Sequence, residues 1–278
     1  MSLTKLYQLA SFSTGDTGGN PAGVWIGEEL PSLDAMQQIA AEVGASETAF
    51  IAPTEGPRRT VRYYSPEVEV SFCGHATIAS GIVLGRLNGE GTYQLDTSIG
   101  EVEVTARQQD EQMMASLRSV DTRQEAVDDA TLQEALDCLR WARGDLDDCL
   151  PPVRAYAGAW HLVLAVRDSA TLEQLDYDFD ALRTLMEREG LTTLQLVWRE
   201  RDDLFHSRNP FPIGGIVEDP ATGAAAAALG GYLRDAGLVE PPITFRILQG
   251  ASMGMPSLIN VDVPKTGGIV VSGYGRDL

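Results

Sequence analysis

The stretch CGHATIASG at residues 73–81 and the stretch DPATGAAAA at residues 219–227 look like two copies of one structural device. Each places a reactive or titratable side chain next to a Gly or a Pro and then runs into a series of small residues. The two stretches are 146 positions apart, and the same separation relates Gly85 to Gly231. Because helix N-termini attract negative charge, we expect two repeated helices that begin at one anion-binding, acid–base site.

The composition is that of an average soluble protein. The chain has 278 residues, of which 44% are hydrophobic and 22% are charged, enough for two domains of roughly 100–150 residues. A net charge of −19 argues against a nucleic-acid partner and against an anionic membrane surface. A small anionic substrate remains compatible, because helix dipoles and a few arginines can reverse the field locally.

Membrane, secretion and metal signals are absent from the sequence. No run approaches the roughly 20 apolar residues of a membrane span, and the N-terminus does not resemble a signal peptide. Three cysteines are too few for a disulfide framework, so we expect reduced thiols and a cytoplasmic protein. The histidines, at 75, 161 and 206, show no zinc or iron spacing, and we expect neither a metal nor a cofactor.

Hydrophobic periodicity predicts an α+β protein. Residues 33–43 and 178–189 have helical spacing, and small-residue helices are expected at about 75–87 and 221–235. Short strands outnumber the helices, and most neighbouring strands look antiparallel. A helix that is small or apolar on every face belongs inside a domain. We therefore expect two curled sheets, each around a central helix, in domains of residues 1–117 (joined by a strand from 265–278) and 118–264, with the active site in the cleft between them.

Three residues are the first candidates for chemistry. Asp219, before Pro220, fits a helix N-cap followed by Pro at the first helical position, a structural role that does not exclude proton transfer. His75, in the first turn of the first small-residue helix, could relay a proton or could be a satisfied, partly buried histidine. Glu47 enters an apolar strand, where it could be a general acid–base or an ordinary strand-entry glutamate.

The remaining reactive residues favour structural roles. A helix N-terminus could activate Cys73 as a thiolate, but its apolar surroundings favour a small buried hydrophobe. We assign no role to Cys138 or Cys149, and we interpret His161 and His206 as structural.

Five short motifs, taken together, resemble the phenazine biosynthesis PhzF-like family. They are GNPAGV at 19–24, SETAF at 46–50, FCGHAT at 72–77, EDPATG at 218–223 and QG at 249–250, and they span about 5–275 in the family's order. The resemblance implies the diaminopimelate epimerase-like fold. That fold has two pseudo-symmetric domains, each with a mostly antiparallel curled sheet around a central helix, and an active site between them.

The resemblance also implies an activity. The best understood member of the family is an isomerase that moves a proton within a dihydro-hydroxyanthranilate ring without cofactor or metal. Glu47 is similar to its general acid–base, and His75 and Asp219 are similar to the partners that orient the substrate and tune protonation. The positions that hold the substrate correspond to Ser46, Gly74, Gly223 and Ala224.

Two departures bear on the substrate, and one bears on the reaction. Ala224 stands where members that make the phenazine precursor carry Ser, and Met255 stands where the family often has Arg. These changes put an anthranilate-type substrate in doubt. Related epimerases use a cysteine in each half, whereas here Cys73 keeps the first position and Asp219 occupies the second, which disfavours a two-thiol racemase.

The combined expectation is a cytoplasmic, homodimeric isomerase in a biosynthetic process. It would act by acid–base proton transfer on a small, anionic, carboxylated cyclic or unsaturated metabolite, without nucleic acid or membrane as partner. Two alternatives stay open: an epimerase or racemase of a small acid, and a non-catalytic metabolite-binding protein on the same fold.

Overall fold

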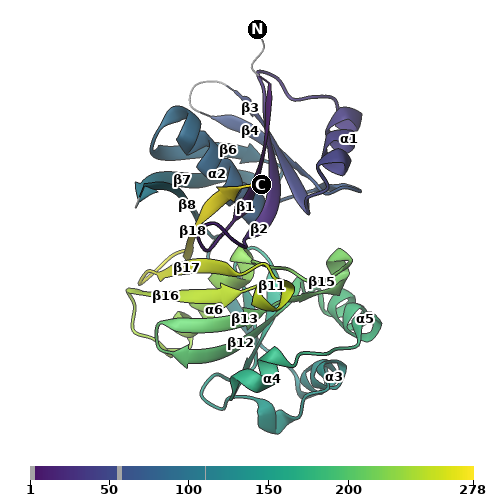
Figure 1. Cartoon of the computed structure of the whole chain (residues 1–278). Helices are drawn as coiled ribbons and strands as arrows, with labels where there is room; N and C mark the ends of the chain where they lie inside the picture. Colours follow the sequence, from purple (N-terminus) through teal and green to yellow (C-terminus); the bar gives the residue numbers. More distant parts are fainter. Residues whose placement is uncertain (1–3, 55–57, 110) are drawn as a thin grey trace. The chain divides into compact units, whose positions relative to one another are not determined.

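The computed structural model describes residues 4–54, 58–109 and 111–278. The chain divides into two compact units, Met1–Arg118 with Ser272–Leu278 (unit 1) and Ser119–Val271 (unit 2). Each unit has its own set of strands and its own central helix (Figure 1).

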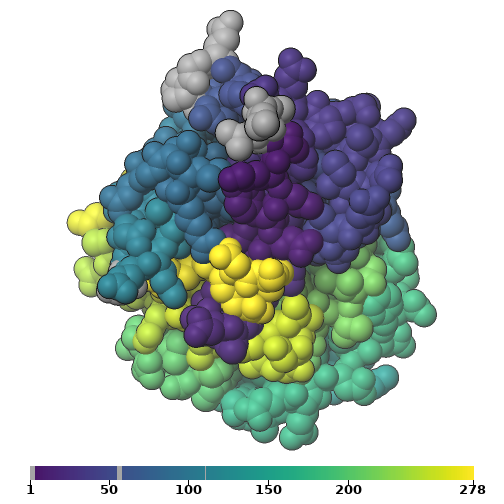
Figure 2. Space-filling model, turned by 45° about the horizontal axis from the view of Figure 1, so that its top comes forward, coloured from purple at the N-terminus to yellow at the C-terminus, as the bar shows by residue number. Residues whose placement is uncertain are grey.

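Unit 1 is a closed ring of strands. Its strand order is β1-β2-β3-β4-β6-β7-β8-β18, and β1 also pairs with β18, so the ring has no free edge along this path. The C-terminal residues of β18 lie against the N-terminal strand at the surface (Figure 2). The elements are β1 (Lys5–Ser11), β2 (Asn20–Ile26), α1 (Leu33–Val43), β3 (Glu47–Pro53), β4 (Arg59–Tyr64), β5 (Glu69–Val70), α2 (Gly74–Asn88), β6 (Gly91–Thr97), β7 (Gly100–Gln109), β8 (Gln112–Arg118) and β18 (Val270–Asp277).

Helix α2 fills the ring. It contacts β1, β2, β3, β6, β7 and β8, and its residues from His75 to Gly85 are all buried. The small residues have a steric cause: a Cβ on Gly81 would lie 2.5 Å from Cγ2 of Val104, and one on Gly85 would lie 2.6 Å from Cβ of Ala106. Small residues therefore let α2 approach β7 closely, while the amphipathic helix α1 covers the outside of the sheet through a cluster that includes Met36 and Phe50.

Unit 2 repeats this plan with added helices. Its strand order is β9-β10-β11-β12-β13-β16-β17, with β14 and β15 as a separate pair. Helix α6 contacts β9–β12 and β17, while α3, α4 and α5 cover β11 and β12 through a second apolar cluster. The elements are β9 (Arg123–Ala126), α3 (Asp129–Leu139), β10 (Val153–Tyr156), β11 (Trp160–Val166), α4 (Ser169–Glu173), α5 (Phe179–Glu189), β12 (Thr193–Arg201), β13 (Leu204–Arg208), β14 (Pro210–Phe211), β15 (Ile216–Glu218), α6 (Gly223–Asp235), β16 (Ile243–Gln249) and β17 (Ser257–Val263), with 3₁₀ turns at Arg143–Asp145, Pro212–Gly214 and Ala251–Met253.

The pairing pattern carries the internal repeat. In unit 1 the pairs β2–β3 and β4–β6 are parallel, and in unit 2 the corresponding pairs β11–β12 and β13–β16 are parallel. The other pairs for which a register is defined are antiparallel, as in β1–β2, β3–β4, β10–β11 and β12–β13. The structure thus confirms the expected α+β class, with curled, mostly antiparallel sheets around central helices.

One expectation about a helix start is wrong. Helix α6 begins at Gly223 with Thr222 as its N-cap residue, so Asp219 is not an N-cap and Pro220 is not the first helical residue. The backbone N–H of Asp219 instead donates to the carbonyl of Asn209, at 3.0 Å. The side chain of Gln249 bonds both the carbonyl of Asp219 and the N–H of Thr222, so residues 219–222 form a loop and the helix starts only after it.

Candidate active site

Strand β3 and helix α2 bring the first group of candidate residues together in unit 1. Glu47 is the first residue of β3, and Cys73 is the N-cap residue of α2. The start of α2 is fixed to the surrounding strands, because the hydroxyl of Ser11 donates to the carbonyl of His75 at 2.8 Å. The hydroxyls of Tyr63 and Thr77 share a second buried hydrogen bond of 2.7 Å.

His75 stands at the centre of this group. Its Nε2 lies 3.3 Å from Oε2 of Glu47 and 3.1 Å from the hydroxyl of Ser46. Its Nδ1 lies 3.3 Å from Sγ of Cys73. The side chains of His75 and Glu47 are only 9% and 19% exposed, so the carboxylate and imidazole interact with little screening by water.

The hydrogen bonds favour one tautomer of the imidazole. The hydroxyl of Ser46 donates to the carbonyl of Pro21 at 3.4 Å, so its oxygen is available to accept a hydrogen bond from Nε2. The carboxylate of Glu47 accepts from the same nitrogen. With the proton on Nε2, Nδ1 is the acceptor for the thiol of Cys73. Glu47 therefore has a partner that can orient it and exchange a proton with it.

The described residues contain one group of side chains close enough to share a metal ion. The ligand atoms of Glu47, Cys73 and His75 lie within 4.8 Å of one another. Glu47 faces Nε2, while Sγ of Cys73 lies nearer to Nδ1. Sγ of Cys73 lies 3.3 Å from Nδ1 and 3.8 Å from Nε2, so thiol, imidazole and carboxylate are mutual neighbours and His75 does not separate the other two groups.

Open space adjoins the start of α2. Among the described residues, no atom lies within 4 Å of a Cβ built on Gly74. An added Cβ would therefore meet no neighbouring element among the described residues. The backbone N–H groups of the first helical turn are the natural binding site for a small anion, and a glycine at this position keeps the approach open.

Unit 2 holds the second group of candidates around Asp219. The hydroxyl of Thr222 donates to Oδ2 of Asp219 at 2.5 Å, and Nε2 of Gln249 donates to the backbone carbonyl of Asp219 at 2.7 Å. Oε1 of Gln249 accepts from the N–H of Thr222 at 3.2 Å. Gly223 is buried in the first turn of α6, and Ala224 beside it is half-buried. Asp219 is itself half-buried and held from several sides.

Residues that anchor this loop were not found from the sequence. Glu218, next to Asp219, forms a buried two-point ion pair with Arg208, in which Nε of Arg208 donates to Oε2 at 2.9 Å. Thr222 and Gln249 lie inside quoted motifs, but their bonds to Asp219 span up to 30 positions and leave no local pattern. The prediction that Asp219 and the group around His75 serve one pocket stays a prediction.

The buried histidine His161 lies outside both groups of candidate residues. His161, fully buried on β11, shares a 2.8 Å hydrogen bond with Thr193, and burial lowers its pKa to about 3.

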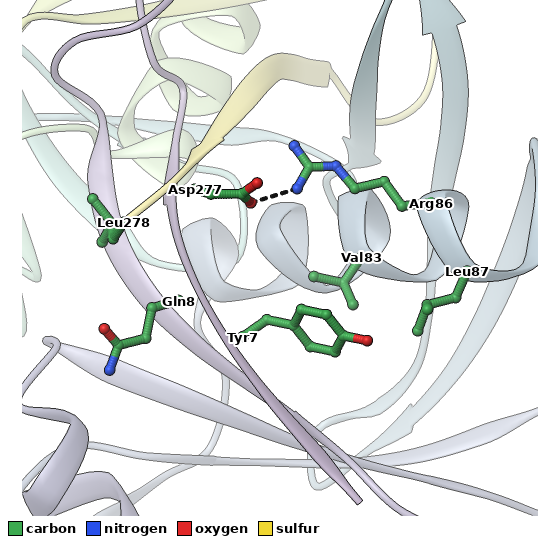
Figure 3. A pocket seen from close by; sticks show the side chains of 7 residues that line it. All are labelled: Tyr7, Gln8, Val83, Arg86, Leu87, Asp277 and Leu278. Carbon is green, nitrogen blue, oxygen red and sulfur yellow. Dashed lines mark hydrogen bonds and ion pairs between the residues drawn. The ribbon is translucent and has the colours of Figure 1, made fainter. Parts of the chain in front are cut away.

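A surface depression of about 380 Å³ lies at the far end of α2 from His75 (Figure 3). Its charged residues, Arg86 and Asp277, pair with each other at 2.6 Å, so it offers no poised acid–base group. In the described parts of the chain, no helix is both long enough and apolar enough to span a membrane.

Known proteins that resemble this chain agree with the resemblance of its motifs. The family of phenazine biosynthesis-like proteins (PhzC–PhzF) matches residues 9–273. The chain belongs to this family. Within it, the chain is 31% identical over 275 residues to an uncharacterised isomerase of Deinococcus radiodurans, covering 95% of this chain and 88% of that protein. It is 27% identical over 277 residues to the uncharacterised isomerase YfhB of Bacillus subtilis, covering 97% and 94%.

Solved structures give the same fold. A predicted epimerase from Pseudomonas aeruginosa superposes with a TM-score of 0.86 at 25% identity, covering 99% of this chain and 97% of that one. A phenazine biosynthesis PhzF-family protein of Bacillus anthracis superposes with a TM-score of 0.85 at 19% identity, covering 100% and 97%. A probable proline racemase of Agrobacterium radiobacter also matches, with a TM-score of 0.65 at 14% identity and coverage of 99% and 91%. The phenazine biosynthesis-like family therefore shares its architecture with racemases.

Proposed function

We propose that the protein is a cofactor-independent isomerase that moves a proton within a small carboxylated cyclic or unsaturated metabolite. The observation that carries this proposal is the largely buried carboxylate of Glu47, 3.3 Å from the imidazole of His75 at the start of α2. A carboxylate held in this way can take a proton from carbon and return it, which is the task of a general acid–base.

The mechanism uses one base for two carbons. Glu47 removes a proton from the carbon next to an activating group, and the electron pair moves through the conjugated system. Glu47 then returns the proton to another carbon. His75 and Ser46 orient the carboxylate, and the N–H groups at the start of α2 stabilise the negative charge that develops on the substrate. On the strength of the motif resemblance, we assign Asp219, Gly223 and Ala224 to the same reaction as orienting and binding residues.

The asymmetry of the repeat supports a single-base mechanism. Thr193 is the first residue of β12 and stands 146 positions after Glu47, the first residue of β3. The repeat therefore has a carboxylate at this position in unit 1 and a hydroxyl in unit 2. A symmetric pair of bases at this position would need a carboxylate in both halves. The names of the isomerase relatives agree with this proposal. The cytoplasmic location, the homodimer and the biosynthetic role stay predictions.

The substitution Glu47→Gln tests the proposal. Small carboxylated cyclic and unsaturated acids are incubated with the protein in D₂O, and proton NMR detects migration of a double bond with deuterium uptake. For the acid that reacts, Glu47→Gln should lower turnover by a factor of at least about 10² to 10⁴, because the amide cannot accept the proton. Binding of the acid, measured by calorimetry, should be largely retained.

The control and the competing outcomes separate the alternatives. The exposed Glu28 changed to Gln should keep full turnover. Full turnover in Glu47→Gln would overturn the assignment. Deuterium uptake at a stereocentre with loss of optical activity, and no bond migration, would select the epimerase alternative, with Glu47 and Asp219 or Cys73 as opposed bases. An acid that binds tightly and is recovered unchanged would select the non-catalytic binding protein.

A further inference from the structure

One group of side chains in unit 1 combines three kinds of metal ligand. Glu47, Cys73 and His75 offer a carboxylate oxygen, a thiol sulfur and an imidazole nitrogen within 4.8 Å of one another. These are the three ligand types that zinc sites in proteins use. The sequence has no zinc spacing because Glu47 lies on β3, far from Cys73 along the chain, and the packing of α2 against β3 unites the group.

Distances within this group match those around a tetrahedral zinc ion. With bonds of about 2.0–2.3 Å, two ligand atoms of such an ion lie about 3.3–3.8 Å apart. Nε2 of His75 lies 3.3 Å from Oε2 of Glu47 and 3.8 Å from Sγ of Cys73. An ion bonded to Nε2 needs the thiol to turn toward it. The side chain of Cys73 makes no capping hydrogen bond to α2, so this rotation breaks no helix cap.

Charge and burial favour an ion with two positive charges. The side chains of His75 and Glu47 are 9% and 19% exposed, and Cys73 is 8% exposed. A thiolate beside a carboxylate is unfavourable here, because water screens the repulsion only weakly. A Zn²⁺ ion neutralises both charges. On binding, the thiol releases its proton to solvent, the Nε2 proton moves to Nδ1, and Zn²⁺ takes its place on Nε2, so one proton leaves for each ion bound.

We propose that Glu47, Cys73 and His75 bind one Zn²⁺ ion, with water at its fourth position. The ion inhibits the proposed isomerase, and this part of the inference rests on that function. A positive ion on the carboxylate makes it a weaker base, so Glu47 no longer takes a proton from carbon. Mg²⁺ and Ca²⁺ prefer six or more oxygen ligands and therefore do not compete for a site of sulfur and nitrogen.

Titrations of the full chain with Co²⁺ and Zn²⁺ test the site without substrate, with excess Mg²⁺ present to cover the acidic surface. Co²⁺ should produce the near-ultraviolet absorption of a thiolate–Co²⁺ bond, and an equimolar amount of Zn²⁺ should remove it. Cys73→Ser should abolish this absorption. Competition with a coloured chelator should show that Cys73→Ser and His75→Gln each weaken Zn²⁺ binding at least about 100-fold, because loss of an outer-shell partner alone costs about 10- to 100-fold.

Two variants outside the group are the controls. Cys138→Ser removes the other buried thiol, and His206→Gln removes a histidine whose Nε2 lies 2.6 Å from the carboxylate of Glu200. Both should keep the absorption and the zinc affinity. Circular dichroism shows whether each variant is folded, and Cys73→Ala replaces Cys73→Ser if the serine variant unfolds. Absorption that persists without the Cys73 thiol, or full zinc affinity in His75→Gln, would overturn the site.

Activity tests the inhibitory part of the proposal. For the acid that the unmodified chain isomerises, Zn²⁺ in a one-to-one ratio should lower turnover at least about 10²-fold, the contribution of a general base, and a chelator should restore it. Zinc that binds as proposed but leaves turnover unchanged would refute inhibition alone. The metal titrations need no substrate, so they decide the site even if the isomerase assay fails.

Discussion

At the scale of single residues, His75 decides what the candidate site can do. The sequence motifs identified Glu47 and His75, because each lies in a distinctive short pattern. They did not show that the imidazole of His75 lies 3.3 Å from the carboxylate of Glu47 and 3.3 Å from the thiol of Cys73. These contacts depend on how β3 pairs and where α2 starts. Cys73 is buried, at 8% exposed, and contacts this imidazole.

Gly250 is a second residue whose surroundings leave no room for a side chain. Its φ of +76° belongs to the left-handed region, and a Cβ would lie 2.3 Å from the carbonyl oxygen of Met255 and 2.7 Å from that of Pro220. Gly254 has a similar φ of +70°, but among the described residues no atom lies within 4 Å of its Cβ position. The two glycines differ in steric contact and not in backbone conformation.

We therefore predict that Gly250→Ala costs more stability than Gly254→Ala. The control, Gly254→Ala, should lose about 1 to 2 kcal/mol, the cost of a left-handed alanine. Gly250→Ala should lose at least about 2 to 3 kcal/mol, because the backbone that carries Pro220 and Met255 must also move. Urea unfolding measures both variants. Equal losses would show that the loop before α6 yields easily to the added methyl group.

At the scale of elements, the central helices are held by close approach. The composition of residues 75–87 and 221–235 predicted two enclosed helices, and the structure has α2 and α6 there. The start of α6 could not be predicted, because Asp-Pro is a strong local signal for a helix start. Gln249, 30 positions away, instead binds the carbonyl of Asp219 and the N–H of Thr222, which a helix starting at Pro220 would need.

Gly81→Ala in α2 tests close approach directly. Alanine raises helix propensity by about 1 kcal/mol, but the new Cβ would lie 2.5 Å from Cγ2 of Val104, and overpacking costs about 1 to 3 kcal/mol. We expect a net loss of stability. Val104→Ala removes the clashing methyl groups. The double variant should therefore lose less unfolding free energy than the two single variants lose in total. Additive losses in a urea double-mutant cycle would contradict this explanation.

The buried His161 of β11 predicts acid sensitivity. Burial lowers its pKa to about 3 in the folded protein, compared with about 6.5 in an unfolded chain. Between these pH values the unfolded chain binds a proton that the folded protein excludes. The free energy of unfolding therefore falls as the pH drops below about 6.5, by up to about 1.4 kcal/mol per pH unit from this group.

His161→Gln should flatten this dependence between pH 4 and 6.5, while its amide keeps a polar partner for Thr193. Urea unfolding at several pH values measures the slope, with His206→Gln as the comparison variant. A slope in His161→Gln equal to that of the unmodified protein would mean that other groups control acid unfolding.

At the scale of the whole molecule, the internal repeat was the most informative sequence signal. It predicted two curled sheets around central helices, and the matching parallel pairs β2–β3 and β11–β12 carry that repeat in the structure. The sequence analysis assigned a strand from 265–278 to the first domain but gave that strand no partner. The pairing of β1 with β18 joins residues more than 260 positions apart, and no local pattern encodes such a contact.

Removal of residues 272–278 should open unit 1 selectively. Leu9, Ala10 and Ser11 of β1 pair with Asp277, Arg276 and Gly275, so deletion leaves their backbone groups exposed. Hydrogen exchange should accelerate in β1 and leave β10 and β11 of unit 2 unchanged. Leu278→Ser, which keeps the paired strand, is the control. Equal acceleration in both units would show that they do not unfold separately.

The split composition of unit 1 also constrains the order in which the nascent protein can mature. Synthesis completes the contiguous stretch Ser119–Val271 before it adds Ser272–Leu278, the segment that completes the earlier half. All residues of unit 2 thus exist before unit 1 has all of its own. A chain cut short before Ser272 would leave Glu47, His75 and Cys73 on an unfinished scaffold.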